Sequence, residues 1–191
     1  MTAWRFEYRA FMDNEPVAVV ASIDAAMAAE NLSRKTQVAS DLYCVGGATD
    51  IAVRVRGTEV KMKGPEKAVD DLVDQMYDQR ASLPCDASVI ANALGLPKDK
   101  DARTLKTENE VRLYMKEKGS KTSVVEKQMT KWEGSRYEIE VSAVVIDAAK
   151  AWTICVASQD AATVRDVLQK YSIVGVGDKM HYAEAVKQRG Q

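Results

Sequence analysis

Short stretches of alternating polar and apolar residues recur along this chain of 191 residues. Within residues 4–9, the charged side chains of Arg5, Glu7 and Arg9 fall on one side and three aromatic side chains on the other. Because successive side chains of a β-strand point to opposite faces, this pattern predicts a strand with one charged face. The same reasoning predicts strands over residues 3–12, 37–45, 49–56, 59–63, 123–131, 136–146 and 151–158.

Basic residues dominate the polar face of two of these strands. Arg54 and Arg56 share one face of residues 49–56, and Lys61 and Lys63 share one face of residues 59–63. Gly57 and Thr58 separate the two strands as a short hairpin connection. One interpretation is the solvated outer face of a hairpin. The other, favoured by four cations with few interleaved acids, is a sheet curled around a lumen that binds anions.

Helical patterns occupy the remaining chain. Ser22 is a suitable N-cap for a helix over residues 23–35, with residues 16–21 either a short strand or a lead into that helix. Residues 65–80 carry apolar residues at helical spacing after a proline. Further helices are predicted after the capping residues Asp86, Thr107 and Asp160, and over residues 180–189.

The order of these elements predicts the fold class. Strands, then helices, then strands form an α+β pattern with antiparallel pairing. We expect one domain over residues 1–191, built as an antiparallel β-barrel or tunnel with a polar lumen and flanking helices, with residues 65–118 as a helical insert.

The composition of the chain limits which partners and catalytic groups it can use. A net charge of −1 gives no basic field for double-stranded nucleic acid, and no apolar stretch is long enough to span a membrane. Cys44, Cys85 and Cys155 are far apart, which favours free thiols and a cytoplasmic location. His181 is the single histidine, so zinc clusters with several histidines are excluded. Any catalysis must use carboxylates, arginines, lysines or a metal ion.

Several motifs are similar to those of the CYTH superfamily, the triphosphate tunnel enzymes. Arg5, Glu7 and Arg9 match the family's opening Glu-x-Glu-x-Lys strand. The strands of residues 52–56, 59–63 and 125–129 resemble its basic strands, and residues 137–141 resemble its acidic strand. Residues 154–160 and 181–184 resemble its last strand and terminal helix. The chain departs from the family at three positions: Arg5 replaces an acid, Met129 a cation and Ala157 a glutamate.

The resemblance implies an eight-stranded tunnel that hydrolyses a triphosphate, either inorganic or carried by a nucleoside or other organic group, with Mg²⁺ or Mn²⁺ as the cofactor. It implies phosphate binding by Arg9, Arg54, Arg56, Lys61, Lys63 and Lys127. Glu7, Glu138 and Glu140 would hold the metal ion, and Lys127 and Glu7 would take part in catalysis. Arginine pairs with phosphate oxygens in a bidentate way, and carboxylates suit Mg²⁺.

Other interpretations remain open from the residues alone. Glu7, Glu138 and Glu140 can instead pair with neighbouring cations such as Arg5 or Arg9. Lys127 can extend to solvent along the sheet, and His181 and Tyr182 can simply pack a terminal helix. The alternative function is therefore a catalytically inactive tunnel protein that binds a nucleotide or polyphosphate, or serves as a subunit of a larger assembly. The sequence leaves the oligomeric state open.

Overall fold

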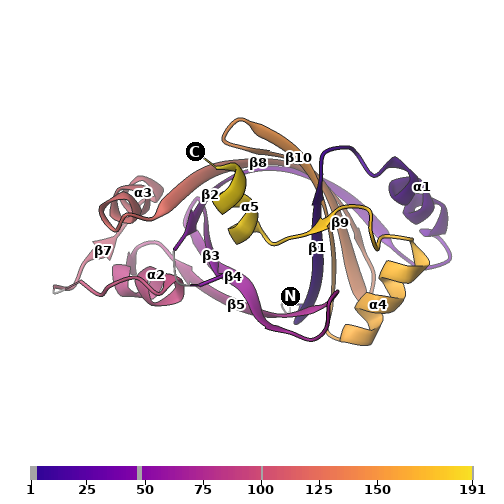
Figure 1. Ribbon diagram of the computed structural model, residues 1–191, viewed down its shortest axis with the longest axis horizontal. Coiled ribbons are helices and arrows are strands. Elements are labelled where there is room, and N and C mark those ends of the chain that lie inside the picture. Colours follow the sequence, from indigo (N-terminus) through magenta and orange to yellow (C-terminus); the bar gives the residue numbers. More distant parts are fainter. Residues whose placement is uncertain (1–3, 47–48, 100, 191) are drawn as a thin grey trace.

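Eight antiparallel strands close into a barrel in the computed structural model, which describes residues 4–46, 49–99 and 101–190 (Figure 1). Five helices flank the barrel within these residues, so the fold class is α+β, as the alternation predicted. Around the barrel the strands follow the order β1 (Phe6–Met12), β10 (Ala149–Ser158), β9 (Tyr137–Ile146), β8 (Lys121–Glu133), β2 (Ser33–Val45), β3 (Ala52–Arg56), β4 (Glu59–Ala68) and β5 (Asp74–Ser82).

Strand β1 closes the barrel. It pairs with β10 from Phe6 opposite Ser158 to Met12 opposite Trp152. On its other side it pairs with β5 at two positions, including Glu7 opposite Asp74. The two-residue strand β11 (Asp178–Lys179) also pairs with β1. Closure gives a sheet a continuous inner face, toward which every second residue of each strand points.

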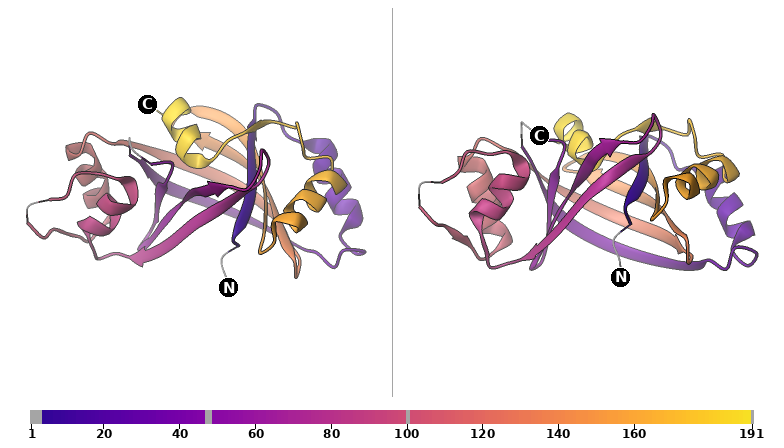
Figure 2. Two further views of the ribbon diagram at one scale, coloured as in Figure 1. Left: turned by 60° about the horizontal axis from the view of Figure 1, so that its bottom comes forward. Right: turned by 90° about the horizontal axis from the view of Figure 1, so that it is seen from below.

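Outward-facing side chains pack beneath the helices. Helices α1 (Val17–Ala26) and α4 (Ala161–Lys170) cover a core that includes Ile23, Trp132 and Leu168. At the other end of the molecule, α2 (Ala87–Leu94) and α3 (Glu108–Glu117) cover a second core with Leu94 and Tyr114 (Figure 2). Helix α5 (Tyr182–Arg189) lies over the barrel opening between them. Most apolar strand residues thus lie outside the barrel, and a third core with Phe11, Val125 and Ile146 fills the inner face beneath α5. The rest of the inner face forms the polar lumen.

The helix predicted over residues 65–80 is wrong. Residues up to Ala68 continue β4, and β5 begins at Asp74. The connection is a tight turn in which the Asp70 carboxylate accepts hydrogen bonds of 2.8 Å from the amides of Leu72 and Val73. A turn of this kind places apolar residues three and four positions apart, which imitates helical spacing. The helical part of the predicted insert therefore begins at α2, and residues 65–82 belong to the barrel.

The first helix also differs from its prediction. Helix α1 begins at Val17 after Pro16, so residues 16–21 lead into a helix and Ser22 lies within it rather than capping it. Asn31 adopts a left-handed backbone with φ of 52°, and β2 starts at Ser33. Residues 33–35 were predicted to be helical from their helix propensity, but they belong to β2. Pairing with β8 along the whole length of β2 stabilises their extended form.

The predicted caps of the three later helices are confirmed. Amides at the start of α2, α3 and α4 donate to the side chains of Asp86, Thr107 and Asp160 respectively. A short ladder, β6 (Cys85–Asp86) with β7 (Thr104–Leu105), joins the ends of the segment that carries α2. None of the helices in the described part of the chain is long and apolar enough to cross a membrane.

Candidate functional site

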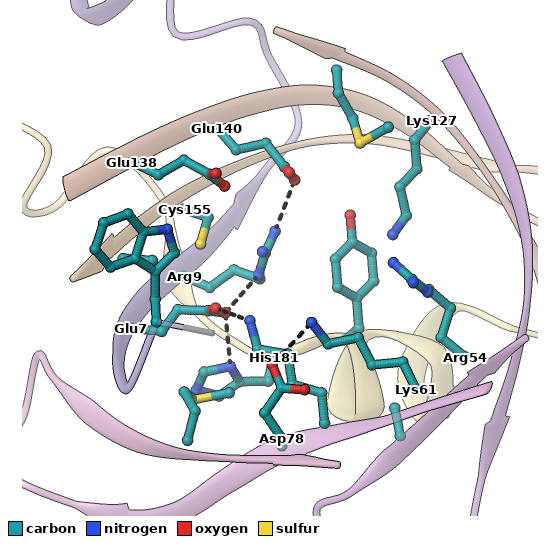
Figure 3. Close-up of a pocket in the computed structure, with 18 of the residues that line it drawn as sticks. Glu7, Arg9, Arg54, Lys61, Asp78, Lys127, Glu138, Glu140, Cys155 and His181 are labelled. Atoms are coloured by element: carbon teal, nitrogen blue, oxygen red, sulfur yellow. Dashed lines mark hydrogen bonds and ion pairs between the residues drawn. The ribbon is translucent and has the colours of Figure 1, made fainter. Parts of the chain in front are cut away.

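The barrel lumen contains a cavity of about 300 Å³ that is rich in charged side chains (Figure 3). This volume lies at the small end of the usual range for ligand pockets. Among the described residues, eight basic side chains line it: Arg9, Arg54, Arg56, Lys61, Lys63, Arg80, Lys127 and Lys131. Five acidic side chains also line it: Glu7, Asp78, Glu133, Glu138 and Glu140. The cavity wall therefore carries an excess of positive charge.

Every site residue predicted from the sequence lines this cavity. The set comes from five strands and comprises Glu7, Arg9, Arg54, Arg56, Lys61, Lys63, Lys127, Glu138 and Glu140. The period-two pattern could identify them because barrel closure turns the charged face of each strand inward. The roles assigned to these residues in binding and catalysis stay predictions.

Glu7 is at the centre of a network of ion pairs. Its carboxylate is buried and accepts hydrogen bonds from Arg9 Nε at 3.1 Å and from Lys63 Nζ. The Nδ1 atom of His181 lies 3.8 Å from the same carboxylate. Burial alone would raise the pKa of Glu7, but these neighbouring cations outweigh it and lower the pKa. Glu7 is therefore ionised and already paired.

Glu140 forms a second ion-pair network on β9, two strands away from Glu7. Its oxygens lie 3.6 Å from Arg9 and 3.2 Å from Lys131, which also pairs with Glu138 at 3.1 Å. Burial raises the pKa of Glu140, while Arg9, Lys131 and Lys127 lower it more strongly, to about 2. The family resemblance led us to expect a second cation at position 129, which is occupied by Met129. Lys131, one inward position further along β8, supplies a lumen cation instead.

Asp41, a residue that the sequence reasoning missed, anchors two of the basic side chains. It is almost fully buried and accepts hydrogen bonds of 2.6 and 2.9 Å from Arg56, while Lys127 Nζ lies 3.3 Å away. A signal was present, since Asp41 is two residues before Tyr43 on a strand whose alternate residues face inward. This bidentate pair holds Arg56 in place.

Lys127 is enclosed by aromatic rings. Its ammonium donates to Tyr43 Oη at 2.6 Å and lies 4.6 and 4.0 Å from the ring centres of Tyr43 and Tyr182. Burial lowers the pKa of Lys127 to about 7, although Asp41 and Glu140 oppose this change. Of the two interpretations left open for Lys127, the one in which it extends to solvent is wrong, because the side chain is buried in the lumen.

Asp78 and Arg80 complete the wall on β5 and were also missed. Asp78 pairs with Lys61 at 2.9 Å and lies 3.9 Å from Arg80. Both alternate with Met76 along the strand, so period-two counting would have found them. The predicted helix over this segment concealed them.

Arg54 has hydrogen-bonding capacity that no protein group uses. One terminal nitrogen pairs with Glu59, whereas Nε is buried and has no acceptor among the described residues. A buried cationic donor without a partner is costly, and Arg54 lines the cavity, so an anion there would compensate the charge of its guanidinium. Figure 3 shows the Arg54 guanidinium beside Lys127 and facing the lumen.

Helix α5 brings its first residue and its N-cap to the cavity. The Tyr182 ring stacks on the Tyr43 ring with centroids 4.9 Å apart. The Arg9 guanidinium lies 4.8 Å from the centre of the Tyr182 ring. His181 Nε2 lies 2.8 Å from Asp74, which holds the start of α5 against β5. These residues thus line the lumen as well as packing the terminal helix.

The three departures from the family pattern have different locations. Arg5 is exposed and lies outside the cavity lining, with its guanidinium 5.5 Å from the ring centre of Phe6. Met129 and Ala157 line the cavity and add no charge. The cysteines are free, and Cys155 lines the cavity.

The carboxylates do not fit a divalent metal as they are arranged. Within the described residues, no group of three or more His, Cys, Asp or Glu side chains is placed to hold a metal ion. Glu7, Glu138 and Glu140 all line the cavity, yet each is paired with basic side chains. Figure 3 shows the Arg9 guanidinium between Glu7 and Glu140.

Several solved structures are similar to this chain in fold. The PH1012 protein of Pyrococcus horikoshii matches with a TM-score of 0.57 and 14% identity, over 93% of this chain and 98% of that chain. A chain of the Schizosaccharomyces pombe Mediator head module matches with a TM-score of 0.52 and 11% identity, over 88% of this chain and 96% of that chain. A candidate adenylate cyclase from Bacillus halodurans matches with a TM-score of 0.50 and 10% identity, over the whole of both chains. At these identities the likeness shows a shared fold.

No protein-family model and no curated protein matches this chain.

Proposed function

We propose that this protein binds a triphosphate-bearing ligand in its cationic tunnel. The observation that carries the proposal is the concentration of eight basic side chains around one cavity, among them Arg54, whose Nε has no acceptor among the described residues. A linear triphosphate offers many anionic oxygens to such a wall, and guanidinium groups bind them in a bidentate way. The fold shared with a candidate adenylate cyclase is in keeping with a triphosphate ligand.

Binding of inorganic triphosphate, measured by isothermal titration calorimetry, tests this proposal. We expect Arg54→Gln to weaken binding by about 10- to 100-fold, because a hydrogen bond to a charged group contributes roughly 1.5–3 kcal/mol. Arg5→Gln is the matched control, since Arg5 is exposed and outside the cavity lining. An affinity that is the same in both variants and the wild type would contradict the proposal.

Hydrolysis of the bound triphosphate is the second candidate function, and Lys127 is the observation that favours it. A buried lysine with a pKa of about 7 gains a proton when an anion fills the cavity, and its ammonium can then stabilise the negative charge that develops on the phosphates during hydrolysis. Glu7 is paired with cations that lower its pKa, which makes it a weak base for the attacking water.

Phosphate release from inorganic triphosphate and from ATP tests this second candidate. The assay is run with EDTA, with Mg²⁺ and with Mn²⁺, and beside a Glu138→Ala/Glu140→Ala double variant and a Lys127→Met variant. Turnover that is lost in Lys127→Met would support a role of this lysine in the reaction. A wild-type protein that binds triphosphate and releases no phosphate is a binding protein.

A further inference from the structure

Arg9 occupies the space between the two buried carboxylates that the resemblance assigns to a metal ion. Its Nε donates to Glu7 at 3.1 Å, and its NH1 atom lies 3.6 Å from Glu140. The same nitrogen donates to Thr153 at 3.3 Å, and the guanidinium lies 4.8 Å from the centre of the Tyr182 ring. Arg9 is 7% exposed, so these contacts hold a buried cation in a defined position.

The local charges balance without a metal. The three carboxylates Glu7, Glu138 and Glu140 are matched by three cations, which are Arg9, Lys63 and Lys131. A divalent ion added to this group would leave two positive charges uncompensated in a largely buried site. Because the desolvation of a buried ion costs several kcal/mol unless it is paired, the group disfavours Mg²⁺ or Mn²⁺.

We infer that Arg9 serves as a built-in cation in place of a divalent metal, and that the tunnel takes its triphosphate ligand free of metal. This inference rests on the proposed function, since it concerns how the same ligand is bound. The positive charge that a metal would bring to the phosphates comes instead from the protein. Arg9 has five N–H donors. Its contacts with Glu7, Glu140 and Thr153 use three of them, so donors remain for a phosphate oxygen.

Triphosphate titrations with and without Mg²⁺ test the inference on the wild-type protein. In EDTA we expect binding, and in Mg²⁺ we expect equal or weaker affinity, because Mg²⁺ complexes the ligand and lowers its negative charge. Tighter binding in Mg²⁺, or binding only in its presence, would overturn the inference. Absence of binding under both conditions would refute the proposed function itself, so the two failures are distinguishable.

Removal of the Arg9 charge gives a second test with a different readout. Mn²⁺ binding without ligand is measured by electron paramagnetic resonance, which reports loss of the free-ion signal. We expect no Mn²⁺ binding by the wild type or by Arg9→Lys, which keeps the charge, and binding by Arg9→Met, which leaves Glu7 and Glu140 facing an uncharged side chain. Addition of Glu140→Gln to Arg9→Met should abolish that binding.

Two results of the Mn²⁺ experiment contradict the inference. One is Mn²⁺ binding by the wild-type protein. The other is an Arg9→Met protein that melts cooperatively and fails to gain Mn²⁺, because Arg9 would then not be what excludes the ion. If Arg9→Met does not fold, the wild-type Mn²⁺ and triphosphate titrations still decide the matter.

Discussion

Single residues of the lumen owe their behaviour to burial beside charges of the opposite sign. Lys127 illustrates this most clearly, because burial lowers its pKa from 10.5 to about 7 even though Asp41 lies 3.3 Å away. An anionic ligand in the same cavity favours the charged ammonium and would raise this pKa again. Ligand binding and protonation of Lys127 should therefore be coupled.

Affinity for ATP, whose terminal phosphate loses its last proton at roughly pH 6 to 7 and is already ionised, should accordingly fall as the pH rises above about 7.5. In this range the free protein has a largely neutral Lys127, so that binding must take up a proton. The expected decrease approaches about tenfold per pH unit, the limit for one coupled proton. Calorimetry in two buffers of different ionisation enthalpy measures the uptake directly.

The matched variant is Lys127→Met. This variant lacks the titrating ammonium, so its affinity for the ligand should be weaker than that of the wild type at every pH. Above about pH 7.5 its affinity should depend much less on pH, because binding no longer takes up roughly one proton. A wild-type slope that persists unchanged in Lys127→Met would assign the proton to another group.

At the scale of elements, helices α1 to α4 pack on the outside of the barrel and contribute none of the described residues of the cavity lining, whereas α5 brings Tyr182 into it. Helix α3 begins at a local hydrogen-bonded cap, in which Thr107 Oγ1 accepts from the Glu110 amide at 3.2 Å. The Glu110 carboxylate in turn accepts from the Lys106 amide at 2.7 Å. Val111 and Tyr114 then pack into the core on the outer face of the barrel. Stability and ligand binding should therefore be separable.

Thr107→Ala tests this separation. Loss of the cap should lower the free energy of unfolding by about 1 kcal/mol, as measured by urea denaturation. Triphosphate affinity should stay the same, because Thr107 is outside the cavity lining. Thr107→Ser keeps the hydroxyl and serves as the control. A large loss of affinity in Thr107→Ala would show that the helical segment is coupled to the lumen.

The whole molecule encloses a charged interior within a ring of strands, and this arrangement makes its stability depend on pH. Glu140 has a pKa of about 2 in the folded protein, against an ordinary value of 4.5. A carboxyl group with a lowered pKa stabilises the folded state above its unfolded pKa, and this contribution is lost as the pH falls. Glu7 changes in the same direction.

We therefore expect the free energy of unfolding to decrease as the pH falls from about 4.5 toward 2. Urea titrations at intervals of pH across this window measure the change. Glu140→Gln, which cannot ionise, should show a shallower decrease over the same window than the wild type. Equal slopes in the two proteins would show that Glu140 does not contribute.

The sequence by itself determined seven of the eight barrel strands, the polar face of each of these, and the capped helices. Arg54, Arg56, Lys61 and Lys63 were found because a two-residue period depends only on backbone geometry. The same rule was not applied to Asp78 and Arg80, because the turn at Asp70 imitates the spacing of a helix and a helix was predicted in place of β5.

Only the tertiary structure decided which charges meet. Barrel closure pairs β1 with both β10 and β5, and this brings residues far apart in the sequence, such as Glu7 and Lys63, into contact. It also places Arg9 between Glu7 and Glu140, although these carboxylates are more than a hundred residues apart in the sequence. Electrostatic energy depends on distance and burial, which a linear pattern does not contain. The sequence could therefore identify the charged residues of the lumen, whereas their pairing, and with it the preference for a metal or for Arg9, is a property of the folded barrel.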